Sequence, residues 1–166
     1  RQVISSNLTL IKTDANGDKL WEKTFIPAAD AGESGEVSVQ QTADGGYIIA
    51  AFTESFGAGD FDVYLIKTDA NGNKLWEKTF GGSFDDEGYQ VQQTQDGGYI
   101  IVGYTLTIIY DFQVYLIKTD ANGNKQWEKT FGGADPDYGH SVQQTADGGF
   151  IIAGGTKSFG EGRNDV

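Results

Sequence analysis

The chain alternates between short apolar runs and polar turns, and no segment longer than a turn repeats apolar residues at helical spacing. In the segment KLWEKTF (74–80), Trp76, Lys78 and Phe80 alternate with Leu75, Glu77 and Thr79, which is the period of two that a strand requires. The segments YIIVG (99–103) and FIIAG (150–154) are instead apolar at every position, as is typical of a strand between two sheets. Asn-Gly and Asp-Gly turns separate these runs. The pattern predicts an all-β chain.

The same strands and turns recur at a fixed period. The Trp-Glu-Lys-Thr-Phe segment recurs at intervals of 55 and 51 residues, at Trp21, Trp76 and Trp127. The Asp-Gly-Gly turn recurs at intervals of 52 and 51 residues, at Asp44, Asp96 and Asp147. One complete unit contains four predicted strands, at 89–94, 99–105, 114–119 and 125–131. Four-stranded units of about 51 residues predict the blades of a β-propeller.

The repeat boundaries predict one domain over 1–166 that contains three blade equivalents. A half-blade at 8–25 and another at 139–156 flank complete blades at 37–80 and 88–131. Propellers typically have about four to eight blades, so three would not close a ring. Either the chain associates with itself through its half-blades, or the remaining blades belong to a longer array. Because the two half-blades complement each other, we favour a homo-oligomer: a six-bladed dimer, a nine-bladed trimer or an unclosed filament.

The segment GGSFDDEGYQVQQTQDGGYIIVGYT, followed by DFQVYLIKTDANGN, resembles the SBBP-type β-propeller repeat of bacterial and archaeal cell-surface proteins. This resemblance covers nearly the whole chain and implies an extracellular or cell-surface location, but no assigned chemistry. DANGNKLW (69–76) is similar to the tryptophan-docking stretch of quinoprotein propellers. TADGG (42–46) is similar to the first half of the sialidase Asp-box, which is structural in that family.

Composition excludes several classes of partner. The formal net charge of −12 would repel nucleic acid. The chain has no cysteine, so a disulfide framework and a thiolate metal site are both excluded. No apolar run approaches the roughly 20 residues of a membrane span, which argues against membrane insertion.

Candidate binding residues lie in the loops that differ between the repeats, because a recognition surface requires such asymmetry. In the segment TLTIIYDFQ (105–113), an apolar cluster replaces polar residues and predicts contact with a protein or glycan partner, or else an extension of two strands. Carboxylates in two other loops are candidate ligand-binding groups, and calcium is the ion they would suit. The candidates are Leu106, Ile108, Ile109, Tyr110, Asp85, Asp86, Asp135 and Asp137.

Catalysis has little support in the sequence. His140 is the single histidine, and no G-x-S-x-G, P-loop or H-E-x-x-H motif is present. We therefore predict a non-enzymatic module without a cofactor, which acts as a scaffold or as a protein- or glycan-binding surface domain. The alternatives are a propeller with a metal- or sugar-binding, hydrolase-like site on the variable loops, and a recently amplified or engineered repeat protein without a ligand.

Overall fold

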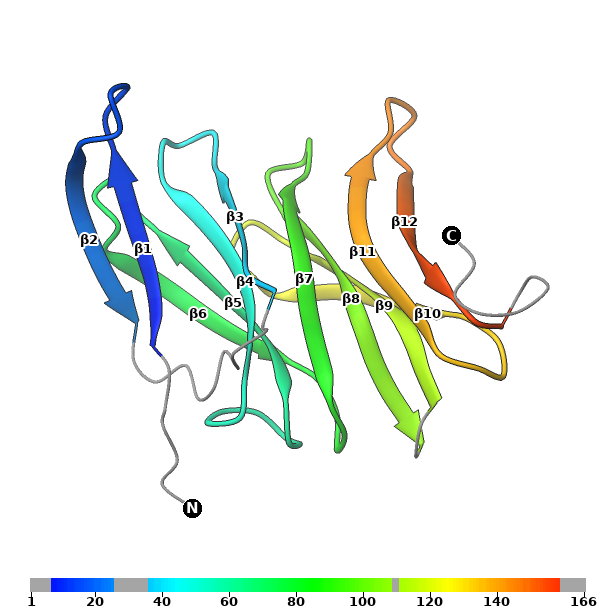
Figure 1. Cartoon of the computed structure of the whole chain (residues 1–166). Helices are drawn as coiled ribbons and strands as arrows, with labels where there is room; N and C mark the ends of the chain where they lie inside the picture. The colour runs from blue at the N-terminus through cyan, green and yellow to red at the C-terminus, as the bar shows by residue number, and fades with distance from the viewer. Residues whose placement is uncertain (1–6, 26–35, 109–110, 159–166) are drawn as a thin grey trace, which may run out of the picture.

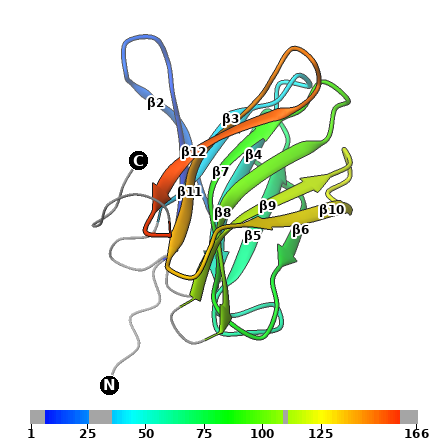
Figure 2. The ribbon, with the colours of Figure 1, turned by 90° about the vertical axis from the view of Figure 1, so that its right-hand side faces the viewer.

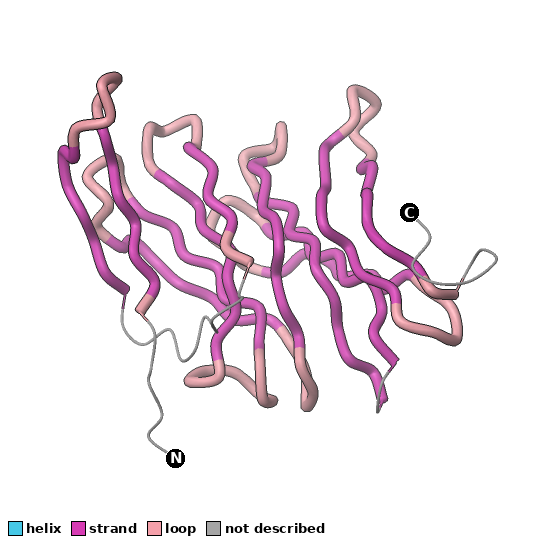
Figure 3. The backbone as a smooth tube through the Cα atoms, in the orientation of Figure 1, coloured by secondary structure: helices cyan, strands magenta, loops and turns pink. Residues whose placement is uncertain are grey.

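The structure is a computed structural model that describes residues 7–25, 36–108 and 111–158. The regular secondary structure in this part consists of β-strands alone, so the prediction of an all-β chain is confirmed (Figure 3). The described part contains no helix that is long and apolar enough to cross a membrane. The strands are β1 (Leu8–Thr13), β2 (Lys19–Phe25), β3 (Ser38–Gln41), β4 (Tyr47–Thr53), β5 (Asp62–Thr68), β6 (Lys74–Phe80), β7 (Asp86–Gln93), β8 (Tyr99–Ile108), β9 (Asp111–Thr119), β10 (Lys125–Phe131), β11 (Asp137–Gln144) and β12 (Phe150–Thr156).

The strands form four separate antiparallel sheets in which each strand pairs with its neighbour in sequence. Two sheets have four strands, β3-β4-β5-β6 and β7-β8-β9-β10, and two have only two strands, β1-β2 and β11-β12. The sheets stand side by side in chain order, with β1-β2 at one end of the row and β11-β12 at the other (Figure 1). The β3–β4, β7–β8 and β11–β12 hairpins project at the same end of the molecule (Figures 1 and 2).

The hydrophobic core consists of three layers, one between each pair of adjacent sheets. Leu8 and Phe25 of β1-β2 pack against Ile49, Tyr64 and Ile66 of the second sheet. A larger layer joins the second and third sheets, and a third layer joins the third sheet to β11-β12. Each sheet is therefore stabilised mainly by burial against its neighbours.

Glutamines on β3 and β7 connect the second, third and fourth sheets. The Oε1 atom of Gln40 accepts a hydrogen bond from the backbone N–H of Gln93 at 2.6 Å, and Oε1 of Gln92 accepts one from the N–H of Gln144 at 2.8 Å. Buried polar groups require such partners. The repeated glutamines thus fix the spacing between neighbouring first strands.

The third sheet is longer than the sequence pattern predicts. β8 continues to Ile108, because Leu106 pairs with Phe112 and Ile108 with Asp111 in the ladder between β8 and β9. This observation agrees with the alternative in which the apolar segment extends two strands. Ile109 and Tyr110 lie outside the described residues.

Candidate functional site

The two predicted ligand-binding carboxylates at the starts of β7 and β11 are buried and bonded to the chain itself. Asp86 and Asp137 are each only 2% exposed. Oδ2 of Asp86 accepts the N–H of Gly82 at 2.7 Å. Oδ2 of Asp137 accepts the N–H of Gly133 at 2.9 Å and the hydroxyl of Ser158 at 2.6 Å. Burial raises the pKa of the Asp86 carboxyl. Both side chains hold a Gly-Gly loop in place.

The other two candidate carboxylates do not join them in a cluster. Asp85 is half-buried, and its Oδ1 accepts a long hydrogen bond of 3.4 Å from the N–H of Phe61. Asp135 is exposed, and the hydroxyl of Ser158 bonds to its backbone N–H and C=O. Within the described residues, no group of three His, Cys, Asp or Glu side chains is placed to hold a metal ion.

The two apolar candidates within the described residues, Leu106 and Ile108, belong to the antiparallel ladder between β8 and β9. Leu106 is half-buried, and its backbone N–H donates to the carbonyl of Asp85 at 2.8 Å. The backbone of Ile108 belongs to β8. This segment therefore does not gather the loop carboxylates into one site.

The single histidine makes a contact between sheets. The ring of His140 stacks on Tyr89 of the preceding sheet with centroids 5.5 Å apart. Its Nδ1 lies 3.9 Å from a carboxylate oxygen of Glu36, and half of its side chain is exposed.

The surfaces that differ most from their repeats are the free sides of the two-stranded sheets. Ile11 of β1 is 56% exposed, whereas the residues at its position in the two complete sheets, Ile66 and Ile117, are 0% and 1% exposed. The local sequence around all three is the same, Leu-Ile-Lys-Thr-Asp-Ala-Asn-Gly. Only the neighbours differ: within the described residues β1 pairs with β2 alone, and the β1-β2 sheet lies at the end of the row (Figure 1).

The C-terminal sheet shows the complementary pattern. Ile151 of β12 is 62% exposed, whereas its equivalents Ile48 and Ile100 are both 0% exposed. Two further residues, Val39 at 52% and Phe131 at 49%, are exposed while their equivalents in the repeat are 8% exposed or less. The equivalents are Val91 and Val142 for the first, and Phe25 and Phe80 for the second.

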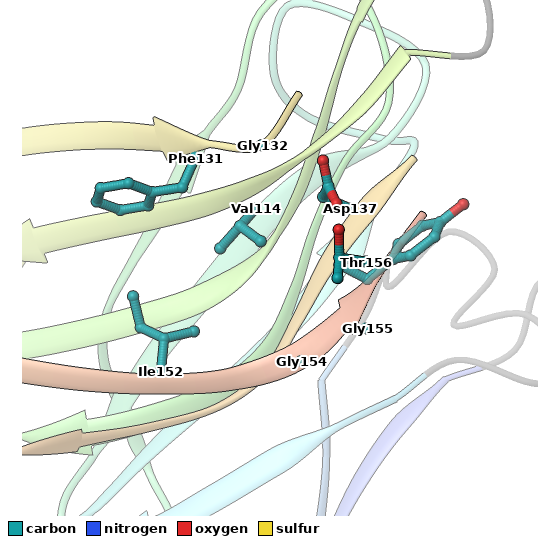
Figure 4. Close-up of a pocket in the computed structure, with 9 residues that line it drawn as sticks. Val114, Phe131, Gly132, Asp137, Ile152, Gly154, Gly155 and Thr156 are labelled. Carbon is teal, nitrogen blue, oxygen red and sulfur yellow. The ribbon is translucent and has the colours of Figure 1, made fainter. Parts of the chain in front are cut away.

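A cavity of about 200 Å³ lies beside the exposed Phe131, between β9-β10 and β12 (Figure 4). Val114 and Ile152 line its apolar part, and Asp137 stands at one end. Oδ1 of Asp137 is buried and lacks a hydrogen-bond partner among the described residues. In the third sheet, the place beside β8 is filled by β9, where Val114 pairs with Tyr104.

A repeated contact connects each β-hairpin to the next sheet. A β-carbon built on Gly72 would lie 2.8 Å from the ring of Trp21, and one built on Gly123 would lie 2.7 Å from the ring of Trp76. The equivalent glycine, Gly17, has no heavy atom within 4 Å of such a carbon.

The same hairpins carry a repeated polar contact. Nζ of Lys23 lies 3.0 Å from Oδ1 of Asn73, and Nζ of Lys78 lies 3.5 Å from Oδ1 of Asn124. The third lysine in this series, Lys129, is exposed and has no such partner among the described residues.

Each complete sheet also contains an ion pair at the end of its third strand. Nζ of Lys67 lies 2.9 Å from Asp44, and Nζ of Lys118 lies 2.9 Å from Asp96. The hydroxyl of Thr42 and the ammonium of Lys67 lower the pKa of Asp44 to about 2. In the two-stranded sheets, the equivalent lysine is Lys12 of β1 and the equivalent aspartate is Asp147 of the β11–β12 hairpin. These two residues lie at opposite ends of the row of sheets (Figure 1).

No family model matches the chain, and no curated protein is similar to it. Sequence reasoning missed Ile11, Ile151, Val39 and Phe131 as surface residues, because nothing in their local sequence separates them from their buried equivalents. One signal was available: Asp18 stands where Asn73 and Asn124 stand in the other hairpins.

Proposed function

We propose that this chain is a non-enzymatic β-propeller module whose ring is completed by further copies of itself. Each four-stranded sheet is one blade, and each two-stranded sheet is half of a blade that a second copy completes. The finished ring acts as a scaffold or as a protein- or glycan-binding surface, in keeping with the resemblance to SBBP-type repeats and their extracellular setting.

The observation that carries this proposal is the exposure of Ile11 and Ile151 beside fully buried equivalents. Burying one isoleucine side chain contributes about 1.5–3 kcal/mol. Clustered exposed apolar side chains usually mark an interface. A second copy would place a sheet against each of these residues, as adjacent sheets cover Ile48 and Ile66 within the chain.

The exposed strand edges support the same conclusion. Within the described residues, β1 and β12 each have one edge without a paired strand. An unpaired edge presents backbone donors and acceptors to any strand that can match it. The free edge of β12 corresponds to the edge of β4 that pairs with β5 in the second sheet. The free edge of β1 corresponds to the edge of β5 that pairs with β4.

The loop carboxylates favour a scaffold over an enzyme. Asp86 and Asp137 are bonded to backbone N–H groups, which gives them a structural role in the loops. The variable loops then remain as a surface for recognition of a protein or glycan.

Light scattering on the purified chain tests the proposal, with a mass of two or more chains as the expected result. Ile151→Glu should lower self-association at least a hundredfold, because a carboxylate would be buried in the interface. Leu75→Glu is the matched control: Leu75 is 58% exposed, and its equivalent in the next repeat is Gln126. A well-folded species at the mass of one chain, or equal behaviour of the two variants, would refute the proposal.

A further inference from the structure

We infer that two copies close a six-bladed ring with two identical junctions, in which β12 of one copy pairs with β1 of the other. This inference rests on the proposed function and adds the register, the contacts and the number of chains. Each junction completes a four-stranded sheet of order β11-β12-β1-β2, with two strands from each copy.

The register follows from the two complete sheets. In the second sheet Ile49 stands opposite Ile66, and in the third Ile101 stands opposite Ile117. The equivalent residues at the junction are Ile152 of one copy and Ile11 of the other. A shift by one residue would turn the apolar face of β1 outward, so this register is strongly specified.

The side chains on each face agree with this register. Ile152 packs against the third sheet of its own chain, next to the cavity and Phe131. Ile11 of the second copy would lie beside Ile152 on that same face and would cover Phe131. On the other face, Ile151 would cover Val39 of the second copy, as Ile48 and Val91 share one core layer within the chain.

The hairpin contact repeats across the junction. Trp21 lies against Gly72 and Trp76 against Gly123, so the next member of the series places Trp127 against Gly17 of the second copy. The positive φ of +88° at Gly17 matches the +76° of Gly72, so its backbone already has the conformation that receives a ring.

Charge complementarity distinguishes the junction from the contacts within the chain. Lys129 of one copy would face Asp18 of the other, whereas the equivalent lysines within the chain face neutral asparagines. A second ion pair would join Lys12 of one copy to Asp147 of the other, as Lys67 joins Asp44 within the second sheet. The carboxylate in place of an amide at residue 18 therefore lies where two chains meet.

The number of copies follows from the blade count. Within residues 7–25, 36–108 and 111–158, two complete sheets and two half-sheets make three blade equivalents in each chain. Two copies give six blades, within the usual range of about four to eight, and three copies give nine, outside that range. Two chains related by a two-fold axis also leave neither the edge of β1 nor that of β12 without a partner strand.

Engineered disulfides test the register and the number of chains together. The chain has no cysteine, so Ile11→Cys with Ile152→Cys introduces the only two thiols. Residues directly opposite in antiparallel strands have β-carbons close enough for a disulfide. Mild oxidation should give a band at twice the chain mass on a denaturing gel. Leu10→Cys with Ile152→Cys is the control, because Leu10 faces the opposite side of β1.

The outcomes separate this inference from the proposed function. A dimer by light scattering without a cross-link refutes the register but leaves self-association intact. A band at three chain masses or a ladder of bands refutes the two-fold ring. A monomer by light scattering refutes the proposed function itself.

Charge reversal gives a second test that leaves the core untouched. Lys129→Asp or Asp18→Lys should each weaken dimerisation about tenfold, because like charges would meet at both junctions. The two changes combined in one chain should restore dimerisation. Asp18→Asn should change it little, since asparagine occupies this position in the other hairpins. If the double variant were no better than either single one, the pairing would be refuted.

Discussion

The contact between tryptophan and glycine gives a quantitative prediction for the packing between sheets. In Gly72→Ala, the new methyl group would lie 2.8 Å from ring carbons of Trp21, at a residue whose φ is +76°. Alanine in a left-handed conformation costs about 1–2 kcal/mol, partly offset by about 0.4–1 kcal/mol from the less flexible unfolded chain. Overpacking against the ring adds about 1–3 kcal/mol. We expect a total loss of about 2–4 kcal/mol.

Gly97→Ala separates the two contributions, because Gly97 has a similar φ of +81° but no heavy atom within 4 Å of a built β-carbon. Its expected loss is about 1 kcal/mol, from the backbone alone. Urea unfolding at one fixed protein concentration measures both variants, since self-association would otherwise shift the midpoint. With a slope of about 2 kcal/mol per molar, the urea midpoint should fall by about 1–2 M for Gly72→Ala and by about 0.5 M for Gly97→Ala. Equal losses within about 0.5 kcal/mol would refute the packing argument.

Three further predictions concern charge and metal. The pKa of both Asp44 and Asp96 is lowered to about 2, so these carboxylates stabilise the fold at pH values above their unfolded pKa of 3.8. Thermal melts should show this stability disappearing as the pH falls from about 4 to about 2, and a melting temperature that does not change in this range would contradict it. Asp44→Asn removes the carboxylate from the buried Lys67 and should cost about 1–3 kcal/mol by urea unfolding; a loss below about 0.5 kcal/mol would contradict this. Millimolar calcium should leave the melting temperature unchanged relative to a chelator, because the described residues contain no cluster of acidic ligands; a rise of several degrees would show that a calcium site exists.

Much of the fold could be predicted because its information is local. Turn residues such as Asn71-Gly72 and the alternation in Trp76-Glu77-Lys78 depend on a few neighbouring positions, and the strands occur where these patterns place them. The ends of strands were less predictable. β8 continues to Ile108 because it finds a partner in β9, and a partner strand is not a property of the segment itself.

The candidate site was harder to predict, because burial depends on distant parts of the chain. The sequence pointed to Asp86 and Asp137 as ligand-binding carboxylates, since carboxylates gathered in variable loops are the oxygen ligands that calcium takes. The structure places both against backbone N–H groups, where they hold the loops. An aspartate in such a loop can either bind a ligand or hold the loop in place, and only the positions of Gly82 and Gly133 show that these two hold their loops.

By itself, the sequence determined the repeat period, the all-β class and the positions of the turns, because each of these follows from short-range preferences of the backbone and side chains. Only the tertiary structure decided which copies of a repeated residue lie in a core. Ile11 and Ile66 occur in the same local sequence, yet one is 56% exposed and the other 0%. The physical reason is that a strand buries its side chains only when another strand and another sheet lie beside it, and on the face that carries Ile11, β1 has neither among the described residues.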